Sequence, residues 1–278
     1  MQGLPRTFQY NIEAAELYPW LIAWHINPTL SANIHYHRKA RSGDAVFMEA
    51  KFWHQIWNEG KIGFHQSEIN KRLIKFWPMV AGKSAGSESI AAAQSCVFVP
   101  LCGKSQDIYW LHQQGHQILG IDLSEKAVQA FFDDNQLACK RDEIDGFVRF
   151  TGTGDADGIT LLAGDFFALQ PSTTAHCSAF YDRAALVAMP EAMRAHYAEH
   201  LVTLVPTESH GLLLAIAYDQ ARMQGPPFSV SDENLRVLLR DGFDIHELAH
   251  FSGPERVGNL AKRGLETLDE RVYLLSRK

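Results

Sequence analysis

From about residue 95 onward, the sequence alternates short apolar runs with segments of helical periodicity. The runs typical of strands are CVFVPL (96–101), HQILGID (116–122), VRF (148–150), ITLLA (159–163), SAFYD (178–182), LLLAIAY (212–218) and VYLLS (272–276). Gly115 can end the first helix between them, and Ser124 can cap the next. Strands that alternate with helices of about ten residues are typical of a parallel sheet with helices on both faces. We therefore expect an α/β fold with a doubly wound, mostly parallel sheet.

Charge balance and cysteine content exclude several classes of protein. Lys and Arg number 26 against 32 Asp and Glu, a net charge of −6, so the chain has no global positive field for a nucleic acid backbone. No apolar run reaches the roughly 18 residues of a membrane span, and no secretory signal opens the sequence. The four cysteines lack CxxC spacing in a chain of 278 residues, which favours a reducing compartment. We expect a cytoplasmic protein with no nucleic acid or membrane partner.

Residues 1–47 differ in character from the rest, because aromatic, His and Pro residues mix there with a basic cluster and no complete domain pattern emerges. Met48 then opens a segment in which Phe52, Ile56 and Trp57 recur at helical spacing. We expect residues 1–47 to be an extension of unknown role, either an accessory arm or an upstream-extended start, and residues 48–278 to form the main domain.

The loop after the first strand is the first candidate ligand site, because ligands of doubly wound sheets bind beyond the carboxyl ends of the strands. Of a glycine-rich dinucleotide fingerprint only Gly103 is present, and Asp122 ends the second strand nineteen residues later. A carboxylate at that place can accept hydrogen bonds from both ribose hydroxyls of an adenosine ligand. The other glycines of the fingerprint, which let a pyrophosphate approach the helix N-terminus, are absent. A nucleoside without phosphates does not need them, so the pattern favours S-adenosylmethionine over NAD or FAD. The alternative is that Asp122 only begins a turn.

A second candidate contact to adenine follows ITLLA, where Asp165 and Phe166 can meet the exocyclic amine and the face of the base. The alternative is that Phe166 and Phe167 belong to the core.

No metal is expected: His112 and His116 are four residues apart, but Gly115 interrupts the helix between them and no third ligand is evident.

Several separated blocks resemble the thiopurine S-methyltransferase family, in particular its bacterial members. The blocks match in order and spacing over about 48–278: FWHQIWNEGKIGFHQ (52–66), VFVPLCGKSQDIYWL (97–111), GHQILGIDLSE (115–125), YDRAALVAMP (181–190), AYDQ to GPPF (217–228) and VYLLSRK (272–278). The resemblance implies the class I methyltransferase (Rossmann-like) fold, a seven-stranded sheet whose last strand is antiparallel. It also implies S-adenosyl-L-methionine as methyl donor and S-adenosyl-L-homocysteine as product.

The resemblance also implies roles for individual residues. Trp53 and Phe64 resemble aromatic residues of a flap over the donor, and Leu101 matches the loop beside its methionine moiety. With Gly103, the ribose ligand Asp122 and the adenine pair Asp165 and Phe166, these are the expected cofactor contacts. Arg183 matches an arginine at the acceptor pocket, which Phe64, Pro227 and Phe228 also line. For a second acceptor arginine the alignment places Asn259, with Arg256 and Arg263 nearby.

The expected mechanism follows from charge. A sulfonium donor and a soft anion lose their opposite charges as the methyl transfers, so a dry pocket closed by Trp53, Phe64, Trp57 and 226–228 favours reaction. Arg183 would hold the acceptor as its anion, and Asp182 is the candidate general base. The alternative for Arg183 is a structural ion pair with Asp182 or Glu191.

The leading hypothesis is therefore a monomeric enzyme that methylates a small thiol, such as a thiopurine or another aromatic or heterocyclic thiol, and also selenium or tellurium compounds. The first alternative within the same fold is a halide or thiocyanate methyltransferase. A second is a non-catalytic sensor that binds S-adenosylmethionine, and a dehydrogenase comes third because the glycine loop is sparse.

Overall fold

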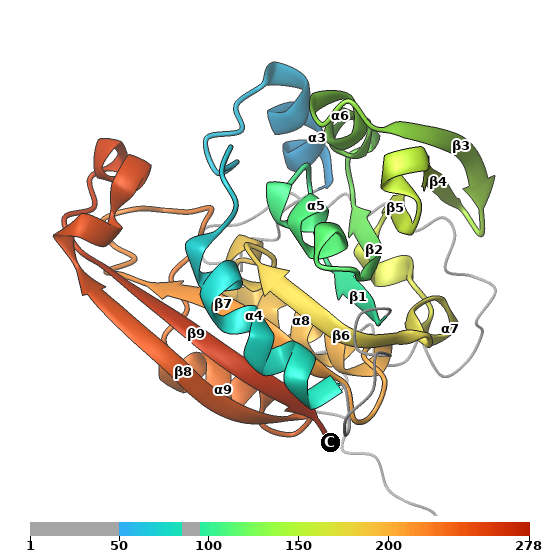
Figure 1. The fold of residues 1–278 in the computed structure, drawn as a ribbon. Helices are drawn as coiled ribbons and strands as arrows, with labels where there is room; N and C mark the ends of the chain where they lie inside the picture. Colours follow the sequence, from blue (N-terminus) through green and yellow to red (C-terminus); the bar gives the residue numbers. More distant parts are fainter. Residues whose placement is uncertain (1–49, 85–94) are drawn as a thin grey trace, which may run out of the picture. The chain divides into compact units, whose positions relative to one another are not determined.

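The computed structural model describes residues 50–84 and 95–278, and within them a nine-stranded sheet has the order β3-β4-β5-β2-β1-β6-β7-β9-β8 (Figure 1). The strands are β1 (Cys96–Val99), β2 (Gln117–Asp122), β3 (Ala138–Ile144), β4 (Phe147–Thr153), β5 (Ile159–Ala163), β6 (Cys177–Arg183), β7 (His210–Ala217), β8 (Phe243–Gly253) and β9 (Leu268–Arg277). The helices are α3 (Ala50–Glu59), α4 (Lys71–Ser84), α5 (Gln106–Gln113), α6 (Glu125–Asp134), α7 (Pro171–Thr174), α8 (Glu191–Leu204) and α9 (Asp232–Leu239). Short 3-10 helices in the described part are η3 (Gly154–Ala156), η4 (Phe166–Ala168), η5 (Leu186–Ala188), η6 (Pro254–Arg256) and η7 (Gly258–Arg263).

The centre of the sheet is parallel and its ends are antiparallel. Strands β5, β2, β1, β6 and β7 pair in parallel, and β9 then pairs antiparallel with both β7 and β8. These strands match the seven-stranded sheet that the family resemblance implies, so the α/β fold class is confirmed. The sheet is wider than expected because β3 and β4 form an antiparallel hairpin that continues from β5.

Helices cover both faces of the sheet because successive strand residues point to opposite sides. In β1, Val97 and Val99 pack into the cluster that α4, α5 and α6 complete, whereas Cys96 and Phe98 face the cluster of α8 and α9. Figure 1 shows α4 and α5 in front of the strands and α8 and α9 behind them. Both clusters are apolar and buried, which gives the doubly wound sheet that the sequence predicts.

Capping residues begin α6 and follow the end of α5 where the sequence predicts. The Ser124 hydroxyl accepts a hydrogen bond from the Ala127 amide at 3.2 Å, and Gly115 adopts a φ of 92° just after α5. The helix around Phe52, Ile56 and Trp57 is also present, as α3. Residues 1–47 lie outside the described residues. No helix in the described ranges has the length and apolar character that crossing a bilayer requires.

Candidate active site

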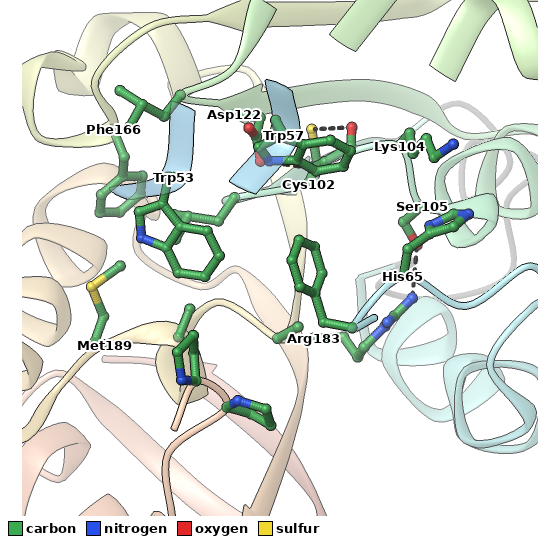
Figure 2. Close-up of a pocket in the computed structure, with 18 of the residues that line it drawn as sticks. Trp53, Trp57, His65, Cys102, Lys104, Ser105, Asp122, Phe166, Arg183 and Met189 are labelled. Carbon is green, nitrogen blue, oxygen red and sulfur yellow. Dashed lines mark hydrogen bonds between the residues drawn. The ribbon is translucent and has the colours of Figure 1, made fainter. Parts of the chain in front are cut away.

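A pocket with a cavity volume of about 350 Å³ opens beyond the carboxyl ends of β1, β2, β5 and β6 (Figure 2). It is therefore at the edge of the sheet where the sequence predicts a ligand site. In the view of Figure 2, Trp53, Phe166 and Met189 lie on one side, and Lys104, His65 and Arg183 lie on the other. The pocket thus has an aromatic side and a cationic side.

Asp122 lies at the end of β2, and its side chain is held by the loop after β1. One carboxylate oxygen accepts a hydrogen bond from the Gly103 amide and the other from the Ser124 amide, both at 2.9 Å. Burial raises the pKa of Asp122 to about 6. The carboxylate retains lone pairs that can accept further hydrogen bonds. This position therefore suits the ribose contact that the sequence predicts.

The loop after β1 is held in an unusual backbone conformation. Leu101 and Gly103 have φ angles of 47° and 52°, and Ala184, after β6, has a φ of 70°. All three line the pocket. A positive φ strains a residue that carries a β-carbon, and such strain concentrates at functional sites. A side chain at position 103 would also place its Cβ 3.2 Å from the Trp57 ring.

Three aromatic side chains near the start of the described chain, Trp53, Trp57 and Phe64, line one wall of the pocket. The ring of Phe64 meets Trp53 edge to face at 5.8 Å between centroids, and it meets Trp57 in the same way at 5.7 Å. Edge-to-face packing fits the quadrupoles of aromatic rings. Since all three rings line the pocket, this aromatic cluster suits the water-excluding flap that the family resemblance implies.

Asp165 and Phe166 both line the pocket, and each also has a structural contact. The Asp165 carboxylate accepts a hydrogen bond from the Phe167 amide at 2.9 Å and so caps η4. Phe166 stacks on Tyr197 at 5.1 Å, inside the core cluster of α8. The ligand contact and the core position, which the sequence left as alternatives, are therefore compatible.

Arg183 lines the pocket at the end of β6 and pairs with a buried carboxylate. Its guanidinium donates to Asp107 from Nε at 3.1 Å and from Nη2 at 2.9 Å, and also to the Ser105 hydroxyl at 2.9 Å. The Tyr181 hydroxyl donates to the same Asp107 oxygen at 3.0 Å. The alternative pairing with Asp182 or Glu191 is wrong, because the partner comes from α5. This network fixes the direction of the guanidinium beside the pocket.

Asp182 is not brought to the pocket. The side chain is fully buried, accepting hydrogen bonds from the Tyr197 hydroxyl at 2.7 Å and from the Leu186 amide at 3.2 Å. Adjacent strand residues point to opposite faces, so Asp182 faces α8 where Arg183 faces α5. Its role here is to join β6 to α8, and the geometry gives no support for Asp182 as a general base.

His65 and Lys104 line the cationic side of the pocket, although the sequence gave no reason to select them. His65 is half-buried, and burial together with the charges of Lys104 and Arg183 lowers its pKa. The imidazole is thus neutral at neutral pH and can accept a proton. The only available signal was the position of His65 next to Phe64 in a matched block.

Cys102 also lines the pocket, but as a protonated thiol. Burial and the nearby Asp122 carboxylate raise its pKa well above the usual value. A protein nucleophile at this position is therefore not favoured.

Only some of the residues expected at the acceptor end line a cavity. Pro226 and Pro227 line the pocket, whereas Phe228 does not and donates its amide to the Val187 carbonyl at 2.7 Å. Arg256 and Asn259 line a neighbouring polar cavity that also includes His65. Arg263 instead donates to the carbonyls of Gly225 and Pro226, so it supports the proline segment.

Comparison with known proteins places these residues in a family. A family model described as thiopurine S-methyltransferase matches residues 48–278. A relative named thiopurine S-methyltransferase from Pseudomonas aeruginosa (strain LESB58) is 46% identical over 230 residues, which are 83% of this chain and 100% of the relative. One of the same name from Pseudomonas syringae pv. tomato is 40% identical over 236 residues, covering 83% of this chain and 99% of the relative.

Solved structures with low sequence identity share the fold. A SAM-dependent methyltransferase from Anabaena variabilis has a TM-score of 0.53 at 12% identity, covering 87% of this chain and 100% of the other. The N-methyltransferase NodS from Bradyrhizobium japonicum, solved with S-adenosyl-L-homocysteine, has a TM-score of 0.52 at 12% identity, with 81% and 97% covered.

Proposed function

Because the chain belongs to the thiopurine S-methyltransferase family and is an S-adenosylmethionine-dependent methyltransferase, we propose that it methylates the sulfur of a small aromatic or heterocyclic thiol, such as a thiopurine. Selenium and tellurium compounds are proposed as further acceptors. The observation that carries this proposal is the unequal charge of the pocket: carboxylates of Asp122 and Asp165 line one part, and the cations Arg183 and Lys104 line another.

These residues suit a donor that is a nucleoside without phosphates. The Asp122 carboxylate is buried and already held by two amides, which supports a role in binding ribose hydroxyls. Phe166 offers an apolar face to a base, and Asp165 offers an acceptor for its amine. When bound, the donor supplies an electrophilic methyl group on a positively charged sulfur. Since the methyl is already activated in this way, we propose that the transfer itself needs no metal.

Arg183 is proposed to bind the acceptor as its anion. Its guanidinium is held by Asp107 and Ser105, so little side-chain entropy is lost when an anion binds. The rings of Trp53, Trp57 and Phe64 exclude water, and attraction between opposite charges is stronger in a dry pocket.

His65 is proposed to accept the proton of an acceptor that arrives as a thiol. The S–H bond breaks, its proton moves to a neutral imidazole nitrogen, and the thiolate remains beside Arg183. A lowered pKa keeps this base available at neutral pH. It thereby replaces Asp182 as the candidate for general base catalysis.

The proposal is tested by supplying the purified full chain with methyl-labelled S-adenosylmethionine and, in turn, 6-mercaptopurine, a thiophenol, selenite and iodide. We expect S-methylated thiols as the main products. In Arg183→Met, kcat/KM for an anionic thiol should fall about tenfold or more, equal to at least ~1.4 kcal/mol, while donor affinity stays within about twofold. Methylation of iodide alone would favour the halide methyltransferase alternative. Donor binding without any turnover would favour the sensor.

Two further proposals concern the chain as a whole. We propose that residues 48–278, the range of the family match, are the catalytic domain and that residues 1–47 are an extension. We also propose that the protein is a monomer and that it is cytoplasmic; the second proposal is supported by the four free cysteines, which suit a reducing compartment.

A further inference from the structure

At the end of the sheet opposite the pocket, two cysteines and a histidine lie together. Cys96 begins β1 and Cys177 begins β6, and their sulfurs are 2.8 Å apart. With His176 they form a group in which one ligand atom from each residue lies within 4.8 Å of the others. The two cysteines are buried and His176 is exposed, so this Cys–His cluster reaches from the core to the surface.

The fold, and no local motif, assembles this cluster. Cys96 and Cys177 are register partners on adjacent parallel strands, and both side chains belong to the core cluster of α8 and α9. His176 lies in the turn between α7 and β6, so its side chain is not required to point to the face opposite that of Cys177, as it would be in a strand. The cysteines are 81 residues apart. No spacing rule for metal ligands could therefore have found them, and the sequence predicts no metal.

Two thiols and an imidazole match the ligand preferences of soft or borderline cations. A tetrahedral zinc ion with Zn–S bonds of about 2.3 Å and a Zn–N bond of about 2.0 Å places its ligand atoms roughly 3.5–3.8 Å apart. All pairs of ligand atoms lie within 4.8 Å, and the sulfurs, at 2.8 Å, are about 1 Å closer than in such a site, so rotation about the Cys side-chain bonds must widen the sulfur pair. Joining the sulfurs as a disulfide needs a change of similar size. The nearby imidazole favours a metal site over a disulfide, because a disulfide involves only the two sulfurs.

We propose that Cys96, Cys177 and His176 form a binding site for a thiophilic divalent cation of the Zn²⁺ class. Each thiol gives its proton to the solvent as its metal–sulfur bond forms, so one Zn²⁺ replaces two protons and no electron is transferred. The neutral imidazole donates its lone pair. A solvent molecule can complete four-coordination on the side where His176 is exposed.

The bound cation would join the start of β1 to the start of β6. The same two strands end at the Leu101 loop and at Arg183, on the pocket edge. Metal binding should therefore stabilise the folded chain without contacting the acceptor.

The test uses tag-free full-length chain, stripped with a chelator and kept reduced, then dialysed against Zn²⁺ and, as a spectroscopic probe, Co²⁺. We expect one Zn²⁺ per chain, with cobalt bands typical of tetrahedral thiolate ligation. We also expect a thermal midpoint about 5 °C higher or more when Zn²⁺ is in hundredfold excess over its dissociation constant. His176→Ala, on an exposed turn, should fold normally and weaken Zn²⁺ binding by at least about tenfold.

The matched control is Cys139→Ser, which removes a free cysteine from the exposed hairpin strand β3 and should keep the wild-type stoichiometry. The double variant Cys96→Ser with Cys177→Ser retains every histidine of the chain, so it separates this cluster from other imidazoles. Persistence of one Zn²⁺ in that double variant, no binding by the wild type, or a Cys96–Cys177 disulfide in the isolated protein would each overturn the proposal.

Discussion

Replacing Asp107 with asparagine removes the charge that the Arg183 guanidinium faces. The Arg183 side chain is 13% exposed and that of Asp107 only 1%, so solvent replaces little of the lost attraction. In the Asp107→Asn variant the charge is lost, and the new NH₂ group faces either the three donors at one oxygen position, two from Arg183 and one from Tyr181, or the Asn70 amide at the other. Removing one partner of a buried ion pair costs about 3–5 kcal/mol. Because Ser105 still accepts from Arg183, we expect a loss of about 3 kcal/mol, at the lower end of that range.

The free energy of unfolding is measured by urea denaturation of the wild type and of Asp107→Asn. The control is Glu125→Gln, which breaks an ion pair with Arg141 in which both side chains are 48% exposed. That exposed pair should contribute less than about 1 kcal/mol. A double variant that adds Arg183→Met to Asp107→Asn removes the unpaired charge and should regain part of the loss.

The same variants report on the active site. With Asp107→Asn the guanidinium loses its fixed direction, so KM for an anionic acceptor should rise while the dissociation constant of the donor changes little. If Asp107→Asn and Glu125→Gln destabilised the chain equally, the buried pair would not be the support of Arg183 that we describe.

The remaining predictions concern the donor end, Asp182 and the extension. Asp122→Asn should weaken binding of S-adenosyl-L-homocysteine by about 1–3 kcal/mol by calorimetry, and a loss below that range would argue against the ribose contact. Since burial raises the pKa of Asp122 to about 6 and the ionised form binds hydroxyls, wild-type affinity should fall by up to about tenfold per pH unit below 6; the Asp122→Asn variant should lack this slope. Tyr197→Phe should cost about 1–3 kcal/mol of stability in urea denaturation with kcat unchanged, whereas a new pH dependence of kcat would restore a catalytic role for Asp182. Removing residues 1–47 should leave the thermal midpoint nearly unchanged, and a large decrease would make them part of the core.

The sequence predicts the central sheet well because its strands are buried on both faces and are therefore short, continuous apolar runs. It does not predict β3, whose residues are mostly exposed and charged, or β8, in which most residues are half-buried or exposed. Such edge strands are defined by pairing with a neighbour more than by their own composition. The family resemblance is confirmed, and it came from several blocks in register.

Individual site residues show where prediction from sequence ends. Asp122 and Gly103 were found because a strand end and a loop have a fixed relation in this fold, and the structure joins them by a hydrogen bond. Asp182 and Arg183 are neighbours, and strand alternation sends them to opposite faces, but which face meets the pocket depends on packing. His65 has no signal beyond its place next to Phe64 in a matched block, and the Cys–His cluster has no local pattern, since long-range contacts bring its two cysteines together.

In the proposed mechanism, one pocket holds the donor nucleoside against Asp122 and the acceptor against Arg183. The most direct measurement is a crystal structure of the full chain with S-adenosyl-L-homocysteine and a thiopurine. We predict ribose hydroxyls on the Asp122 carboxylate, the base against Phe166, and the acceptor sulfur on the Arg183 side, facing the sulfur of the nucleoside. A nucleoside bound with its ribose at Arg183, or an acceptor bound outside the pocket, would contradict the account.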